Sequence, residues 1–322
     1  MAKPLVSILI PVYNREKLIG ACIQSALEQT ITDIEVVVVD NASTDDTWRV
    51  CQEYVQKDSR VRIFRNEQNI GPVRNWQRCI DEARGQYGKI IFSDDLIHPQ
   101  YLEKTIPIIE KYSVAFVFST VCIAEEEWKG YSFYRYRQNT SIIPTKEYIK
   151  DCVLGDSLPV SPGCALFWMH DLRKNLYFKI SSPTITDFDK HGAGPDLLLF
   201  LLTANNYKNI GYVNDTLVYF RSHLGSITIS DKTGYLQKCY LQAKIWFVKD
   251  SIHNKLLDKL LINGWLFECK KNINIIAYGE FTRQYLTETK KFNSWILLKV
   301  VINVFKIKSR KAINRLIFNN KI

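Results

Sequence analysis

The sequence predicts an α/β protein with a doubly wound, mainly parallel sheet and a helical extension at its C-terminal end. Two observations predict the sheet: short apolar runs alternate with segments of helical spacing, and several of these runs end in polar clusters. A third observation predicts the extension, because the spacing of apolar residues turns helical beyond about residue 234.

The first four predicted strands alternate regularly with helices. Residues 5–10 are a continuous apolar run that ends at Pro11, and residues 35–39 contain four consecutive valines. Both runs have the length and composition of fully buried strands. In chain order we expect strand 5–10, helix 18–27, strand 35–39, a helix after residue 44, strand 61–64, helix 73–83 and strand 89–92.

Two further helices have recognisable start signals. Ser43 or Thr44 is suited to cap the helix after the second strand, with acidic residues 45–46 in its first turn. Residues 194–196 mark a later start, because Pro195 suits the first helical position.

The composition is that of a globular protein with a sizeable core, with 46% apolar and 24% charged residues. We expect a main domain over residues 1–233 and a helical, basic extension over residues 234–322. The eight cysteines contain no C-x-x-C pair, which argues against a zinc or redox motif and favours a reduced, cytoplasmic compartment. The first residues run directly into a predicted strand and leave no room for a signal peptide.

The formal charge of +10 is concentrated near the C-terminus. Residues 290–322 hold nine basic residues and no acidic one, which leaves +1 for the rest of the chain. We therefore expect no nucleic-acid partner for the main domain. Residues 295–307 are too short to span a bilayer, but their narrow polar stripe favours a helix lying in an anionic membrane interface. The alternative is a helix packed on the domain with its basic face in water.

Polar residues follow three of the predicted strands, at residues 13–14, 40–41 and 94–95. Ligands of doubly wound sheets bind beyond the carboxyl ends of the strands. Because three separate elements end in this way, we expect their polar side chains to converge on one edge of the sheet.

Asp94 and Asp95 are candidate ligands of a cation. Two adjacent carboxylates at the end of a buried strand repel each other and lose hydration, and a bound cation offsets both costs. Mg²⁺ and Mn²⁺ take oxygen ligands of this kind and bridge them to substrate phosphates. The alternative is an ordinary solvated turn.

Asp40 and the segment 69–75 are candidate nucleotide contacts. The Asp40 carboxylate leaves the core at a strand end, where it can accept hydrogen bonds from a ribose or a base. In segment 69–75, Gly71 allows close backbone approach and the following helix start favours an anion. The alternatives are a helix cap at Asp40 and an ordinary turn at Gly71.

Taken together, these motifs resemble those of the large family-2 group of glycosyltransferases. The resemblance covers about residues 5–225 and implies a GT-A fold, with a nucleotide-binding half over 1–113 and an acceptor half over 114–233. The motifs that carry it are Pro11-Val12-Tyr13-Asn14, Val38-Val39-Asp40-Asn41-Ala42-Ser43-Thr44-Asp45, Asn69-Ile70-Gly71 and Phe92-Ser93-Asp94-Asp95.

The resemblance also implies roles for particular residues. Asp40 is expected to contact the nucleoside, Asp94 the ribose or diphosphate, and Asp95 the metal ion, which would be Mn²⁺ or Mg²⁺. The family motif is often D-x-D, and Ser93 stands at its first position here. The remaining residues expected to line the donor pocket are Pro11, Tyr13, Asn69, Arg74 and Asn75.

The second half of the chain adds two segments similar to family motifs. Residues 192–196 resemble the segment with the catalytic base, which makes Asp196 the candidate. A first-turn position favours its ionised form. Asp187 and Asp189 are weaker alternatives, and a structural helix-dipole Asp is the plain alternative. The segment Tyr219-Phe220-Arg221-Ser222-His223 resembles the closing R-x-H segment, so Arg221 is expected at the donor diphosphate and His223 at the metal, although a lone histidine is more often structural.

These roles imply an inverting, metal-dependent transfer of a sugar from a nucleotide-diphosphate donor to an acceptor hydroxyl. The resemblance implies bacterial surface polysaccharide of the capsule or O-antigen type as the setting. The partners would be a nucleotide-sugar donor and a saccharide or lipid-linked saccharide acceptor. We expect the protein to be cytoplasmic and peripheral on the inner face of the membrane.

Three other functions are compatible with parts of the pattern. A sugar-nucleotidyltransferase would also use carboxylate-bound Mg²⁺, but no basic Gly-rich loop follows the first strand. A dinucleotide oxidoreductase is disfavoured because no G-x-G-x-x-G follows an early strand. A non-catalytic, membrane-associated scaffold of the same fold would have no need for so many carboxylates at the strand ends.

Overall fold

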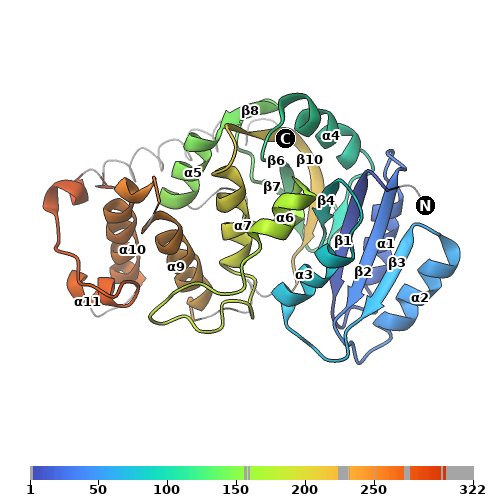
Figure 1. Cartoon of the computed structure of the whole chain (residues 1–322), viewed down its shortest axis with the longest axis horizontal. Coiled ribbons are helices and arrows are strands. Elements are labelled where there is room, and N and C mark those ends of the chain that lie inside the picture. The colour runs from blue at the N-terminus through green and yellow to red at the C-terminus, as the bar shows by residue number, and fades with distance from the viewer. Residues whose placement is uncertain are drawn as a thin grey trace. The chain divides into compact units, whose positions relative to one another are not determined.

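A computed structural model describes residues 3–155, 158, 160–223, 231, 233–249, 251–271, 276–298 and 300–301 (Figure 1). The chain forms two compact units. The first comprises Met1–Ile180 and Thr186–Ala243, and the second comprises Ser181–Ile185 and Lys244–Ile322.

The first unit is built on a ten-stranded sheet. The two predicted apolar strands, β1 and β2, lie side by side near one end of this sheet, and every residue of both is buried. The strands are β1 Val6–Val12, β2 Ile34–Asp40, β3 Val61–Arg65, β4 Tyr87–Ile90, β5 Leu96–Ile97, β6 Phe116–Ala124, β7 Tyr131–Phe133, β8 Ser141–Pro144, β9 Ala165–Trp168 and β10 Asn209–Arg221.

The strand order is β3-β2-β1-β4-β9-β6-β10-β5, with β7 beside β6 and β8 beside β10. Strands β3, β2, β1 and β4 are mutually parallel, as are β6 and β10. Strand β9 runs antiparallel to both β4 and β6 and joins the two parallel groups. The predicted α/β fold is confirmed, and its doubly wound part corresponds to the first hundred residues.

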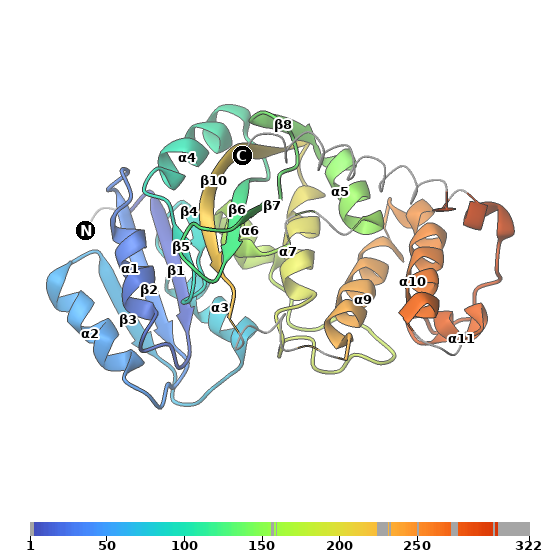
Figure 2. The same cartoon turned by 180° about the vertical axis from the view of Figure 1, so that it is seen from behind.

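Helices cover both faces of this sheet. Helices α1 and α2 lie on one face and α3 and α6 on the other (Figure 1 and Figure 2). The helices are α1 Ile19–Leu27, α2 Thr47–Lys57, α3 Pro72–Glu82, α4 Tyr101–Tyr112, α5 Thr145–Leu154, α6 Met169–Asn175, α7 Pro195–Ala204, α9 Tyr235–Lys249, α10 Leu257–Lys271 and α11 Tyr278–Arg283, with short 3₁₀ turns at Pro162–Cys164 and Asn254–Leu256.

The expected cap of α2 is wrong. The helix begins at Thr47, and Asp46 occupies the N-cap position without a side-chain cap bond. Ser43 instead donates to the Asp40 carboxylate, and the Thr44 N–H donates to Asn14 Oδ1 at 2.9 Å. The physical reason is the burial of Asp40, because a buried carboxylate requires hydrogen-bond donors more than an exposed helix end does.

The end of the chain after β10 is helical in its described parts. No described helix is both long enough and apolar enough to cross a membrane. The predicted interfacial helix over residues 295–307 falls mostly outside the described residues. All eight cysteines are free.

The close approach of the loop before β4 to β1 generates a stability prediction. A Cβ at Gly85 would lie 2.5 Å from the backbone nitrogen of Ser7, which cannot move without disturbing β1. We expect Gly85→Ala to lower the free energy of unfolding by roughly 1–3 kcal/mol, measured by urea denaturation.

Gly20→Ala is the matched control. Its Cβ would meet nothing nearer than Tyr54 Oη at 3.5 Å. Since alanine favours a helix, the control should raise the free energy of unfolding by roughly 0.5–1 kcal/mol. Equal effects of the two changes would contradict the strand packing described here.

Candidate active site

The acidic pair lies where β4 leaves the sheet. Asp95 is buried, and its Oδ1 accepts a hydrogen bond of 3.0 Å from the backbone N–H of Arg221, the last residue of β10. Burial, and next the charge of neighbouring Asp94, raise the pKa of the Asp95 carboxyl well above its usual value. Two strand ends that are far apart in the chain thus meet at this carboxylate.

Basic side chains surround Asp94. His223 Nε2 lies 2.8 Å from Asp94 Oδ2, and Arg15 Nε lies 3.7 Å from the same oxygen. The Arg221 Nε donates to the backbone carbonyl of Asp94 at 3.2 Å, and its Nη2 pairs with Glu127 at 2.9 Å. Arg221 and His223 therefore lie together at the acidic pair.

The donor set at this loop fits a divalent cation. Among the described residues no group of three His, Cys, Asp or Glu side chains is arranged as a complete metal cage. A magnesium-type ion does not need one, because it binds one or two carboxylates and takes its other ligands from phosphates and water. Asp94 and Asp95 offer carboxylate oxygens of this kind, and a cation would offset both causes of the raised pKa of Asp95, which are burial first and the charge of Asp94 second.

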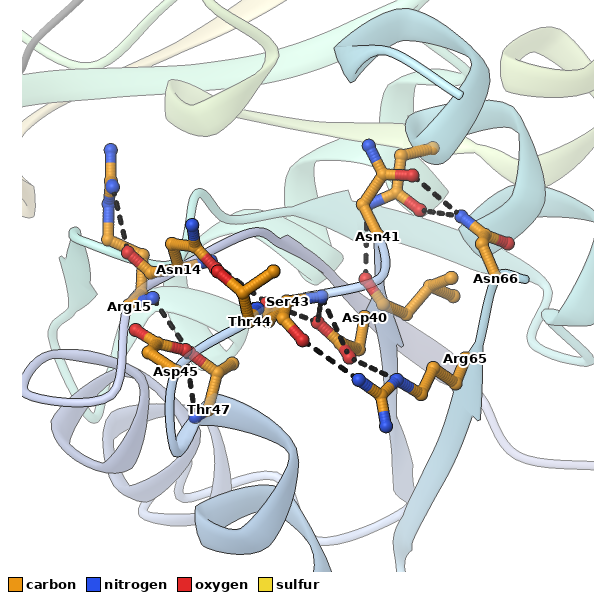
Figure 3. Close-up of polar contacts among 12 residues, drawn as sticks. Asn14, Arg15, Asp40, Asn41, Ser43, Thr44, Asp45, Thr47, Arg65 and Asn66 are labelled. Carbon is orange, nitrogen blue, oxygen red and sulfur yellow. Dashed lines mark hydrogen bonds and ion pairs between the residues drawn. The ribbon is translucent and has the colours of Figure 1, made fainter. Parts of the chain in front are cut away.

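Asp40 is completely buried at the end of β2. Its carboxylate accepts from the N–H and the hydroxyl of Ser43, and Arg65 Nε lies 3.1 Å from Oδ2 (Figure 3). Pro11 is buried in β1, whereas Tyr13, just beyond that strand, is 40% exposed. Buried Asp40 and exposed Tyr13 thus lie at the ends of neighbouring parallel strands, on the carboxyl edge of the sheet.

Asparagine side chains join β2 to the start of α3. Asn41 Oδ1 accepts from Asn66 Nδ2 at 3.0 Å (Figure 3). Asn41 Nδ2 donates to Asn69 Oδ1 at 2.8 Å. Asn75 is buried, donates to the Val39 carbonyl at 3.0 Å and accepts from Asn66 at 2.9 Å. Since its amide bonds within the protein, we assign Asn75 to holding α3, while exposed Asn69 stays a candidate for donor contact.

Arg74 connects α3 with a distant loop. Its Nε lies 2.7 Å from Asp189 Oδ2, and its guanidinium lies over the Phe178 ring at 5.2 Å. Asp187 pairs with His191 at 3.0 Å and accepts a hydrogen bond from Tyr235. The two alternative bases thus both have partners within the protein, Asp189 in an ion pair with Arg74 and Asp187 in hydrogen bonds with His191 and Tyr235.

Asp196 lies in the first turn of α7, next to Gly194, which has a φ of 105°. Its Oδ1 accepts from the N–H groups of Gly194 and Leu197 at 2.8 and 2.7 Å, and its Oδ2 accepts from the Tyr240 hydroxyl at 2.7 Å. Burial raises the pKa of Asp196 to about 7, and the hydrogen bonds oppose this only in part. The N–H groups at the helix start do favour the ionised form, as expected, but desolvation outweighs them and the net pKa of Asp196 is raised.

Sequence reasoning missed several charged and hydroxyl groups near these carboxylates. Lys89 is buried inside β4, donates to the Gly163 carbonyl and lies 4.4 Å from the Tyr101 ring centre. Burial lowers the pKa of Lys89 to about 7. A lysine inside an apolar strand is a signal that the sequence contains, whereas Tyr240 and Glu127 have no local signal.

The fold is that of a glycosyltransferase of the GT-A type. The chain belongs to glycosyl transferase family 2, whose family model matches residues 7–176. It is 26% identical over 224 residues to the glycosyltransferase GlyG of Streptococcus pneumoniae serotype 4, a match that covers 69% of this chain and 72% of GlyG.

Two further comparisons cover different parts of the chain. Chondroitin synthase of Escherichia coli is 43% identical over 119 residues, which is 36% of this chain and only 17% of that enzyme. The crystal structure of S. aureus TarS 1–349 in complex with UDP-GlcNAc superposes with a TM-score of 0.65 at 18% identity, over 87% of this chain and 79% of TarS 1–349. At this identity the TarS likeness shows the fold alone.

The asparagine contacts predict different effects for two neighbouring residues. Asn75→Ala leaves the Val39 carbonyl and the Asn66 amide short of a partner in the interior, so we expect it to cost about 1–3 kcal/mol of unfolding free energy. Asn69→Ala also removes an acceptor, for Asn41 Nδ2 and the Gly71 N–H, but water can replace it at this exposed position, so we expect a smaller cost of about 0.5–1 kcal/mol. Urea denaturation of the two variants checks this, and a larger loss in Asn69→Ala would contradict the assignment.

Proposed function

We propose that this enzyme transfers a sugar from a nucleotide-diphosphate donor to an acceptor hydroxyl, in a metal-dependent reaction that inverts the anomeric centre. The observation that carries the proposal is the pair of buried Asp95 and half-buried Asp94, which has Arg15, Arg221 and His223 around it. Carboxylates for a metal beside cationic groups for phosphate are what a nucleotide-diphosphate site requires.

In this proposal the donor lies along the carboxyl edge of the sheet. Asp40 and Tyr13 face the nucleoside, with Pro11, Asn69 and Arg74 lining the pocket. Asp94 and Arg221 contact the ribose and diphosphate. The TarS structures contain UDP or UDP-GlcNAc, which supports a donor of this chemical class for a chain with the same fold.

The diphosphate leaves with the electron pair of the broken C–O bond and needs positive charge near it. Asp95, with Asp94 and His223 beside it, would hold Mn²⁺ or Mg²⁺, and such an ion supplies Lewis-acid stabilisation of a departing phosphate. The Arg221 guanidinium, fixed on one side by Glu127, is aimed at the same charge. Arg15 adds a second guanidinium at this edge.

Asp196 is the proposed general base. It takes the proton of the acceptor hydroxyl while that oxygen bonds to the anomeric carbon from the face opposite the diphosphate. One displacement of this kind inverts the stereochemistry without a covalent enzyme intermediate. A carboxylate with a pKa of about 7 is well matched to accept a proton at neutral pH.

The biological setting that we propose is synthesis of a bacterial surface polysaccharide. The names of relatives support it, among them a putative teichuronic acid biosynthesis glycosyltransferase of Bacillus subtilis, 33% identical over 36% of this chain. The acceptor would be a saccharide or a lipid-linked saccharide. The basic helical segment 234–322 would act as an extension of the transferase domain 1–233 and hold it at the inner face of the membrane.

Donor binding gives the first prediction for this function. A thermal-shift screen of UDP, GDP and dTDP with Mn²⁺ should show stabilisation by one base type, by about 2.7 kcal/mol at a nucleotide concentration 100 times Kd. Asp95→Ala should abolish the part of this stabilisation that depends on Mn²⁺. Asp33→Ala, which removes an exposed carboxylate just before β2, should leave it unchanged. If no nucleotide shifts the wild-type protein with or without metal, the transferase proposal fails and a scaffold of the same fold takes its place.

The raised pKa of Asp196 gives the second prediction. Because the base must be ionised, kcat/KM should rise with pH through about 7 and level off above it. Asp196→Asn keeps the shape and should lose at least about 100-fold in activity across the pH range. A wild-type profile that is flat between pH 5 and 8 would contradict the assignment.

The raised pKa of Asp196 also predicts that the stability of the protein falls as pH rises, whereas its activity rises. The folded protein holds the Asp196 proton more tightly than the unfolded chain does, so this group's contribution to stability is complete below about pH 4 and is lost as pH rises through about 7. Asp196→Asn removes this pH-dependent loss of stability, because the asparagine side chain does not ionise. The variant should therefore melt higher than wild type at pH 8, by about 2–4 °C for each kcal/mol regained, measured by calorimetry.

A further inference from the structure

We infer that Tyr240 is a positioning residue for Asp196, and that its hydroxyl leaves one lone pair of Oδ2 as the place where the acceptor proton goes. The inference rests on the proposed role of Asp196 as general base. It names a residue outside every motif in the sequence, from a helix that follows the last strand of the sheet.

The hydrogen bonds around the carboxylate determine which oxygen is available. Each carboxylate oxygen has two lone pairs. The Gly194 and Leu197 N–H groups occupy those of Oδ1, while Oδ2 accepts only the Tyr240 hydroxyl among the hydrogen bonds described. The remaining lone pair of Oδ2 is therefore the acceptor site for the attacking hydroxyl.

The direction of the Tyr240 hydrogen bond is fixed. Burial, and next the charge of Asp196, raise the pKa of the Tyr240 phenol well above its usual value, so it remains a donor throughout the working pH range. A neutral phenol that donates to Oδ2 favours the ionised carboxylate, and this opposes the effect of burial.

The other titratable groups that respond to Asp196 are neutral at working pH. They are Tyr134, which follows β7, and Cys239, which precedes Tyr240 on α9. Burial is the main cause that raises the pKa of both groups, and it raises the pKa of Cys239 to about 11. Because these neighbours add no positive charge, the Tyr240 hydroxyl and the two N–H groups carry the stabilisation of the ionised base.

Tyr240→Phe isolates the hydroxyl, because it keeps the ring that packs in α9. The first measurement is a carbon-13 NMR titration of the aspartate carboxyls in the full chain, with Asp196→Asn to assign the signal. We expect a midpoint of about 7 in the wild type and a midpoint higher by about one pH unit in Tyr240→Phe.

Tyr235→Phe is the matched control. It removes a hydroxyl from the same helix, one that donates to Asp187 instead. The Asp196 midpoint should be unchanged in this variant. Placing 3-fluorotyrosine at position 240 strengthens the donor and should move the midpoint downward, an effect of opposite sign that a packing role would not produce.

The second measurement is Mn²⁺-dependent hydrolysis of UDP-GlcNAc, in which water takes the place of the acceptor. Because a midpoint one pH unit higher leaves a smaller ionised fraction of Asp196, Tyr240→Phe should lower kcat about 5-fold at pH 7, with almost no deficit at pH 9 and an unchanged KM for the nucleotide sugar. Tyr235→Phe should follow the wild-type pH profile.

The outcomes separate this inference from the proposed function. If the Asp196 midpoint and the pH profile of Tyr240→Phe match those of wild type, the inference is overturned while the transferase proposal stands. If the wild-type protein neither binds nor hydrolyses any nucleotide sugar, the proposed function fails. The titration then still decides whether Tyr240 controls the carboxylate.

Discussion

Two adjacent carboxylates at the end of a buried strand impose the constraint on which the site depends. Asp94 and Asp95 repel each other, and Asp95 has little contact with water. Three groups stabilise these charges. The Arg221 N–H at the end of β10 donates to Asp95, while the His223 ring just beyond β10 and Arg15 from the loop after β1 lie beside Asp94. These contacts stabilise the acidic pair, and they join the loop after β4 to the loop after β1 and to the end of β10 at one edge of the sheet. The ends of β4 and β10 and the loop after β1 therefore meet at the acidic pair, where we propose that a metal ion and a diphosphate bind.

The carboxylates of this enzyme have different neighbours and therefore different chemistry. Asp40 and Asp94 lie beside guanidinium or imidazole groups, which suit them to polar recognition. Asp196 instead receives only N–H and hydroxyl donors among its described hydrogen bonds, and burial brings its pKa to about 7. A carboxylate with a pKa of about 7 can exchange a proton near neutral pH, as a general base must. In our proposal, the surroundings therefore make Asp196 the residue for proton transfer and leave Asp40 and Asp94 for polar recognition.

The sequence predicts those features that arise from short stretches of chain. The valine run of β2 and the apolar run of β1 identify buried strands, and the convergence of their ends follows from parallel topology. The cap of α2 was predicted wrongly because local preference gives no weight to the buried Asp40 carboxylate that draws Ser43 away. Tyr240 and Glu127 could not be found, since each acts on a residue 44 or 94 positions away in the chain. Lys89 was overlooked because an apolar run around a lysine reads simply as a strand.

The most direct test of the central claim is a crystal structure grown with UDP and Mn²⁺, with anomalous data collected at the manganese edge. The account predicts one strong manganese peak beside the Asp95 carboxylate, at the 2.0–2.2 Å typical of such ions (about the magnesium distance) and shared with the diphosphate. The nucleoside should lie against Asp40. Manganese bound away from Asp94 and Asp95, or a nucleotide bound elsewhere than at this edge of the sheet, would contradict the account.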